Sequence, residues 1–321
     1  MKLKYLVSFI LLITTGDIYT CNSCGGGTSD LAVLSLDGTA LINLGFTFDN
    51  YTGVWDKDGK WRTNNYSQSQ LKTVLAAAYR ISRHLQFAVA LPFVNNKSNI
   101  PGLKQSGSGI GDLTLGGRYE FTHEFQPKKK GKKLVLDNKL PYTALTFGFT
   151  VPTGVSEETA INDVDISGKG FFSSSVGLSV TKSLIKSKLQ ITGDFSWQHS
   201  FEKNYESLYG EPLNSDYRKK PGDKFNYSLS INYIFNSWHA IALTASGFAQ
   251  NNYKINDVPG INSEERSANF ILSYTYYPSV PFRITSSFKM GIPSDNLGRN
   301  VQGSTSFNIN FTYYFSDLNI K

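Results

Sequence analysis

Hydrophobic and polar residues alternate along the chain with a period of two from about residue 39 to residue 315. In the first such segment, 39–49, Ile42 and Phe48 share one parity, whereas Asn43 and Thr47 occupy the other. A period of two is typical of β-strands that present one apolar face. Eleven further segments repeat the pattern: 70–81, 85–93, 109–121, 142–152, 170–181, 188–199, 224–235, 239–249, 266–277, 282–291 and 303–315. The sequence therefore predicts an all-β protein with about twelve strands.

Charged residues are confined almost entirely to the polar parity of these segments. On the apolar parity there is no Asp, Glu or Lys, and Arg266 is the single Arg, at the start of its segment. An unpaired charge that faces lipid at the middle of a bilayer costs about 2–4 kcal/mol, which explains such one-sidedness in a membrane barrel. We therefore expect the polar parity to line the lumen, with these charged residues: Lys72, Arg80, Asp112, Arg118, Glu120, Asp194, Arg283 and Lys289.

The connections between the segments alternate in length. The long ones span about 50–69, 94–108, 153–168, 200–223, 250–265 and 292–302, and apart from 122–141 the others are short. Outer-membrane barrels have short periplasmic turns and longer extracellular loops. Since backbone polar groups in lipid must all be paired, the strands have to close on themselves. We predict a closed antiparallel up-and-down transmembrane β-barrel with both termini in the periplasm, rather than a soluble sandwich, whose outer face carries more charge.

The first residues are typical of a secretory signal. Lys2 and Lys4 precede an apolar run of about nine residues, which is too short to span a bilayer as a helix. We expect a signal peptide at 1–20, a Cys- and Gly-rich lead-in or plug at 21–38, the barrel at 39–316 and a short tail at 317–321. The mature chain contains no run of 18 apolar residues, so we expect no helical span. A secretory signal followed by a transmembrane barrel predicts a location in the outer membrane of a Gram-negative-type bacterium.

Composition and charge change this interpretation little. Aromatic residues make up 14% of the chain, as strands with interfacial aromatic belts require. The formal net charge is +7, but much of it lies in one run, Lys128, Lys129, Lys130, Lys132 and Lys133, which we expect in a solvated turn. This run is either a plain basic loop or a contact for lipid headgroups or an acidic partner. We expect no nucleic-acid partner.

Two glycine-containing motifs resemble a known family. One is Gly109-Ile110-Gly111-Asp112-Leu113, and the other, at the end of the next segment, is Pro152-Thr153-Gly154. Together with Leu91-Pro92-Phe93 they are similar to the outer-membrane barrels of the phenol-degradation meta-pathway family. The resemblance implies passive transport of small solutes, hydrophobic or aromatic compounds among them, without naming one. We expect no cofactor.

The glycines have a physical meaning of their own, because glycine in a strand marks a bulge or a close backbone approach. Gly109 and Gly111 would let the connection 94–108 fold inward, with Asp112 near the pore mouth. Asp112 then either pairs with a base such as Arg118 or caps the loop, or contacts solute. The lumen as a whole is either a water-filled pore with a mild preference for anions or a closed core of ion pairs.

Cys21 and Cys24 are the two cysteines of the chain. In an oxidising compartment a local disulfide is the simplest outcome, and metal or redox handling and lipid attachment at Cys21 are the alternatives. This pair supports a second hypothesis, a structural or partner-binding barrel that uses its N-terminal segment.

We expect no enzymatic activity. His199 and Ser200 are adjacent on a strand and face opposite sides, so they do not form a nucleophile–base pair. The expected partners are outer-membrane lipid and lipopolysaccharide, a small-molecule solute and the barrel-assembly machinery, which reads a terminal aromatic strand such as 311–315.

Overall fold

The computed structural model of the chain describes residues 39–82, 84–121, 127–130, 133–136, 141–185, 188–279 and 281–315. For 65, 66, 127–130 and 133–136 the backbone alone is described. The predicted signal peptide (1–20), the lead-in with Cys21 and Cys24 (21–38) and the tail (317–321) lie outside the described residues.

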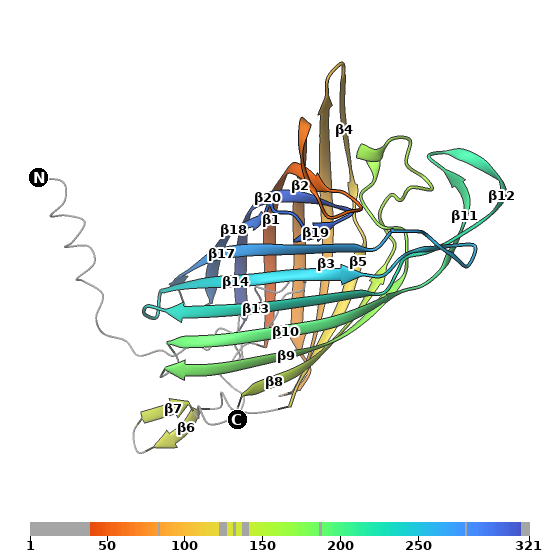
Figure 1. Ribbon diagram of the computed structural model, residues 1–321. Coiled ribbons are helices and arrows are strands. Elements are labelled where there is room, and N and C mark those ends of the chain that lie inside the picture. The colour runs from red at the N-terminus through yellow and green to blue at the C-terminus, as the bar shows by residue number, and fades with distance from the viewer. Residues whose placement is uncertain are drawn as a thin grey trace, which may run out of the picture.

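Twelve long strands form the wall of the molecule (Figure 1). They are β1 (Ala40–Trp55), β2 (Trp61–Arg80), β3 (Leu85–Ile100), β5 (Leu113–Glu120), β8 (Tyr142–Val151), β9 (Ser173–Ile185), β10 (Leu189–Ser200), β13 (Lys224–Ile234), β14 (His239–Gln250), β17 (Glu265–Ser279), β18 (Phe282–Gly291) and β20 (Val301–Phe315). The predicted strand number is confirmed.

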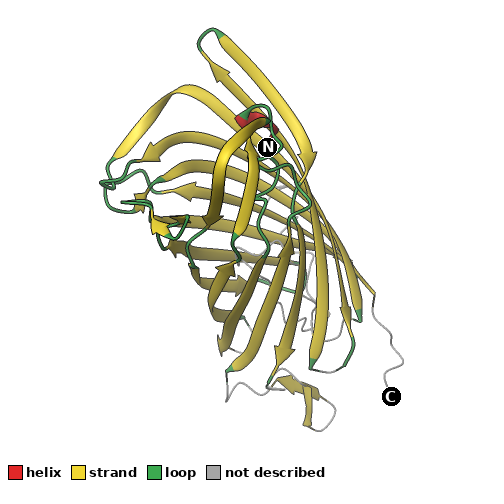
Figure 2. Ribbon diagram, turned by 90° about the vertical axis from the view of Figure 1, so that its right-hand side faces the viewer, coloured by secondary structure: helices red, strands yellow, loops and turns green. Residues whose placement is uncertain are grey.

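The wall is closed. β1 pairs antiparallel with both β2 and β20, and β14 pairs antiparallel with both β13 and β17, so the sheet has no free edge along the barrel. Ala40 is the register partner of Phe315, which places the start of β1 and the end of β20 at the same end of the barrel. The tight turns lie at this end, which we call the short-turn end. We call the other end the long-loop end (Figure 2).

Burial follows the alternation of the sequence. Leu75 is 56% exposed and Phe48 is 48% exposed, whereas Leu41 and Ala76 are each 1% exposed. The exposed parity is therefore the apolar one, as expected for strands whose outer face contacts lipid and not water. No described helix is long and apolar enough to cross a membrane.

The prediction that the long connections are loops is wrong for several of them, because they contain strands. β1 and β2 extend into 50–69. The connection 94–108 is an extension of β3 that turns back as β4 (Leu103–Ile110). Beyond the bilayer the outer face no longer has to be apolar, so the alternation fades although backbone pairing continues.

Other strands decorate the barrel. β11 (Lys203–Leu208), β12 (Glu211–Lys220), β15 (Lys254–Ile255) and β16 (Val258–Pro259) form a small sheet at the long-loop end. There β19 (Gly298–Arg299) pairs with β17, and the single-turn 3₁₀ helix η1 (Asp163–Asp165) packs against β4. At the short-turn end the predicted basic turn is instead partly a hairpin of β6 (Pro127–Lys130) and β7 (Lys133–Leu136), and Lys132 lies outside the described residues.

Candidate lumen and loop anchor

A row of polar side chains crosses the inner wall near the short-turn end. Arg80 on β2, Gln86 on β3 and Arg118 on β5 are register partners on the inward parity. The Glu120 carboxylate lies between them, with Oε2 2.9 Å from Arg80 Nη1 and Oε1 2.9 Å from Gln86 Nε2. Arg118 Nε is 3.6 Å from Oε1, an ion pair that is too long for a hydrogen bond. We call these four residues the wall cluster.

The wall cluster is withdrawn from solvent. The side chains of Arg80, Arg118 and Glu120 are 8%, 10% and 4% exposed, and the Arg118 guanidinium lies 5.6 Å from the centre of the Tyr142 ring. Within the wall cluster two guanidinium groups face one carboxylate. Three of the charged residues expected in the lumen are thus brought together: Arg80 from β2, and Arg118 and Glu120 from β5.

A second inward row joins the first strand of the barrel to its last two. Asp49 on β1 is the register partner of Ser306 on β20, which is the partner of Lys289 on β18. Ser306 Oγ donates a short hydrogen bond to Asp49, and Lys289 Nζ lies 3.7 Å from Asp49 Oδ1. Lys289 was expected in the lumen and Asp49 was not, although its parity is the signal that identifies it.

The remaining expected residues of the wall are dispersed. Asp194 Oδ2 accepts a hydrogen bond of 3.0 Å from Ser228, and the Arg283 guanidinium lies 5.2 Å from the centre of the Tyr314 ring. Lys72 lies on the inward parity of β2, between Thr47 and Val94.

Lys224, which the sequence analysis passed over, also lies on the inward parity, with its ammonium group 3.7 Å from the centre of the Phe248 ring. Lys224 is the first residue of the segment 224–235, where the alternation of polar and apolar residues only begins.

Asp112 has a different role from the wall residues. Its carboxylate accepts backbone hydrogen bonds from Gly154 (3.1 Å) and Lys169 (2.6 Å), which belong to the connection 152–172. Thr153 Oγ1 adds two more links, since it donates to Gly111 O at 2.8 Å and accepts from Leu113 N at 3.0 Å. The two motifs that resemble the family thus form one hydrogen-bonded loop anchor, in which Asp112 caps the loop.

A stripe of glycines lets this connection approach the projecting β3–β4 hairpin. A Cβ atom on Gly107 would collide with Val164 O, and one on Gly109 would lie 2.7 Å from Ser167 Oγ. Asn96 on the same inner face donates to the carbonyl oxygens of Val164 (3.0 Å) and Ile166 (2.8 Å). The expectation that the connection 94–108 folds inward is wrong. It projects beyond the barrel as the β3–β4 hairpin, and the connection 152–172 packs on the inner face of this hairpin.

The other side of the connection 152–172 is held by the β11–β12 hairpin (Figure 1). Glu158 and Lys203 form an ion pair of 2.6 Å, and Glu157 and Lys219 form one of 2.7 Å. Tyr209, at the turn of the hairpin, donates a hydrogen bond of 2.7 Å to Asp163. We call this set of contacts the mouth cluster. It fixes the connection between two hairpins at the long-loop end.

The mouth cluster shifts two pKa values. Burial opposes ionisation of Glu158, but hydrogen bonds from Lys203 and the Glu206 N–H, together with the Lys203 charge, outweigh it and hold the pKa of Glu158 below its usual range. The hydrogen bond to Asp163, followed by burial and nearby carboxylates, raises the pKa of Tyr209 to about 12.

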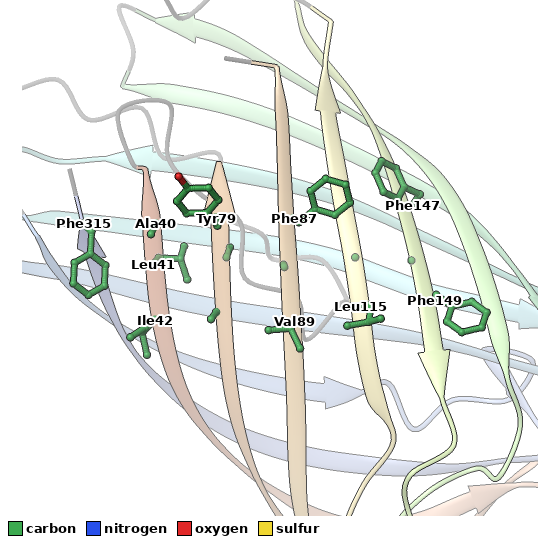
Figure 3. Close-up of a pocket in the computed structure, with 15 residues that line it drawn as sticks. Ala40, Leu41, Ile42, Tyr79, Phe87, Val89, Leu115, Phe147, Phe149 and Phe315 are labelled. Carbon is green, nitrogen blue, oxygen red and sulfur yellow. The ribbon is translucent and has the colours of Figure 1, made fainter. Parts of the chain in front are cut away.

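A separate apolar cavity of about 740 Å³ lies along the wall near the short-turn end. Figure 3 shows two rows of large side chains, with Tyr79, Phe87 and Phe147 in one and Val89 and Leu115 in the other. These residues belong to the exposed parity, so the cavity has the chemistry of the lipid-facing surface. It adds no charged group to the lumen.

Two histidines of the described part of the chain pair with neighbouring side chains, and no metal-binding cluster is found there. No group of three or more His, Cys, Asp or Glu side chains there is arranged to hold a metal ion. The His199 ring pairs with Asp223 at 2.7 Å, and the His239 ring with the Tyr274 hydroxyl at 2.7 Å.

Comparisons with known proteins agree with this architecture. The family described as "Putative MetA-pathway of phenol degradation" matches residues 44–311. The COG4313 outer membrane channel from Pseudomonas putida F1 is similar in structure, with a TM-score of 0.70 and 14% identity over 91% of this chain and 100% of that one. This likeness shows a shared fold, that of an outer-membrane barrel.

Two other solved structures are less similar to this chain. The translocator domain of the autotransporter NalP from Neisseria meningitidis gives 0.48 at 10% identity, covering 86% of this chain and 88% of that one. The KdgM porin gives 0.44 at 8% identity, covering 85% and 99%. Among curated proteins, none matches the chain.

Proposed function

This chain belongs to the family described as "Putative MetA-pathway of phenol degradation", and we propose that it is a channel for the passive uptake of small solutes across the outer membrane. Aromatic and other hydrophobic compounds are the first candidates, because the family description refers to phenol degradation. A channel-type barrel of this kind points to transport and not to catalysis.

The observation that carries this proposal is the contrast between the two ends of the lumen. Near the short-turn end the wall cluster places buried, mutually paired charges on the inner wall. At the long-loop end the connection 152–172 is tied to the inner face of the β3–β4 hairpin. A barrel of twelve strands is intermediate between those filled by side chains and those with a wide aqueous channel, so such elements determine what passes.

The proposed path runs along the inward parity. It places solute against the wall cluster and the row of Asp49, Ser306 and Lys289, with Lys72, Asp194 and Arg283 along the wall. Asp112 contributes by holding the mouth and not by touching solute. The excess of basic over acidic groups in the wall cluster favours anions over cations.

The proposed orientation sets the short-turn end in the periplasm. Short turns face the periplasm in outer-membrane barrels, whereas longer loops face outward. The barrel-assembly machinery would then meet β20, whose last residues are rich in aromatic side chains.

Single-channel conductance in planar lipid bilayers tests the proposal. The full chain should give discrete openings, with a reversal potential in a salt gradient that favours anions. A chain that lacks 21–38 should be compared with it, because that segment is a candidate plug. Absence of openings in both chains would contradict the channel and favour a structural or partner-binding barrel.

A further inference from the structure

Arg266 is a cation on a surface that is otherwise apolar. It lies on the exposed parity of β17, whose other members are apolar or aromatic: Ala268, Phe270, Leu272, Tyr274 and Tyr276. A charged side chain on the lipid face is tolerated near the membrane interface and not at the midplane. The position of Arg266 along the strand therefore bears on its role.

The strand geometry puts Arg266 at the edge of the membrane. Tyr276 lies ten positions further along the strand, and its ring stacks on His239 at 5.3 Å near the short-turn end. Ten residues of antiparallel strand span about 34 Å, or about 24–28 Å along the barrel axis at a tilt of about 35–45°. The apolar band of such barrels is about 25 Å tall. If Tyr276 marks one interface, Arg266 lies at the other.

A second cation lies beside it. Arg299 on β19 is the direct register partner of Arg266, so the two side chains leave the sheet on the same face. Like charges directly opposite each other on neighbouring strands repel. Arg299 forms an ion pair of 2.5 Å with Glu264, whereas in the described part of the chain Arg266 has no carboxylate partner. The three side chains carry a net positive charge.

We propose that Arg266 and Arg299 form a binding site for the phosphate group of a phosphorylated glycolipid of the lipid A type in the outer leaflet. Guanidinium groups bind phosphate through paired hydrogen bonds, and a phosphate between the two arginines relieves their repulsion. The site rests on the proposed orientation of the barrel, which places the long-loop end at the outer leaflet. It does not depend on conduction.

Native mass spectrometry of the full chain in detergent tests the site. The probes are bisphosphorylated lipid A, dephosphorylated lipid A and phosphatidylglycerol. Bisphosphorylated lipid A should bind best, and Arg266→Gln should weaken its binding about tenfold, the effect of losing charge-assisted hydrogen bonds. Arg62→Gln is the matched control, because Arg62 is an exposed arginine that pairs with Asp56 at the β1–β2 hairpin. It should leave binding unchanged.

Three results would overturn the site. They are equal binding of the dephosphorylated lipid, equal binding of phosphatidylglycerol, and unaltered binding by Arg266→Gln. Arg266→Lys keeps the charge but loses the paired geometry, so it should bind with intermediate strength and serves if the glutamine variant does not fold. Conductance of the same variants should match that of the parent chain, which separates failure of this site from failure of the channel.

Discussion

The wall cluster and the mouth cluster use the same chemistry in different surroundings. Glu120 is bound by two arginines and a glutamine on three neighbouring strands, with its side chain 4% exposed. Glu158 is bound by Lys203, whose side chain is 31% exposed, and both lie in connections outside the wall. Burial strengthens electrostatic interactions and raises the cost of losing a partner, whereas solvent screens an exposed pair. The first cluster therefore stabilises the barrel wall, and the second holds a connection outside the wall.

Removal of the carboxylate from the wall cluster should have the largest effect. Glu120→Gln removes the buried carboxylate that Arg80 and Arg118 share, and breaking a buried ion pair costs about 3–5 kcal/mol. The free energy of unfolding, measured by urea titration in lipid vesicles, should fall by about this amount. Glu158→Gln is the matched control in the mouth cluster, and an equal loss in both variants would remove the distinction between the clusters.

A side chain added at the glycine contact should have the second-largest effect. Gly107→Val inserts a side chain where Val164 O now lies, so the connection 152–172 has to move off the β3–β4 hairpin. Overpacking of this kind costs about 1–3 kcal/mol. Limited proteolysis within 152–172 should accelerate. The control is Gly193→Ala on β10, where an added Cβ meets nothing within 4 Å, and a similar acceleration there would contradict the close-approach role.

Loss of the capping carboxylate should have a comparable or smaller effect. Asp112→Ala leaves the N–H groups of Gly154 and Lys169 without their acceptor, at about 1–3 kcal/mol if water does not replace it. Hydrogen exchange at these two amides should speed up, while exchange in β10 and β13 should not change. Slow exchange at 154 and 169 in the variant would show that another acceptor holds the loop.

The smallest effect should come from the mouth ion pairs. Lys203→Gln should cost about 0–1 kcal/mol, and less at high salt. The pH response follows from Glu158, whose folded pKa is lowered: its contribution to stability is present above the unfolded pKa and is lost as pH falls through the folded value. Hydrogen exchange of 155–165 should therefore rise under acid in the parent and respond less in Glu158→Gln. A pH response of equal size in both would point to other groups.

Much of the barrel could be predicted from the sequence, because contact with lipid imposes a strict rule on one residue in two. That rule locates all twelve strands, and it also assigns Asp49 and Lys224 to the inward parity. It fails beyond the bilayer, where β1 to β4 continue without an apolar face. The mouth could not be predicted either. The motif glycines indicated a close backbone approach, but which segment approaches depends on register across β5, β8 and β9.

Pairings between distant segments were also out of reach. Asp49 meets Lys289 because β1 and β20 close the barrel in one particular register. Nothing in the local pattern specifies that register. The contacts of Glu157 and Glu158 with Lys219 and Lys203 depend in the same way on how a hairpin outside the membrane folds back.

Conductance of the parent chain and of Gly107→Val, recorded side by side in the same planar bilayers, tests the account most directly. If the connection 152–172 restricts the mouth of a polar lumen, the variant should show a larger single-channel conductance than the parent at the same salt concentration. Its preference for anions should persist, because the wall cluster is untouched. Equal conductance in the two proteins, with the connection shown by proteolysis to have moved, would contradict the account.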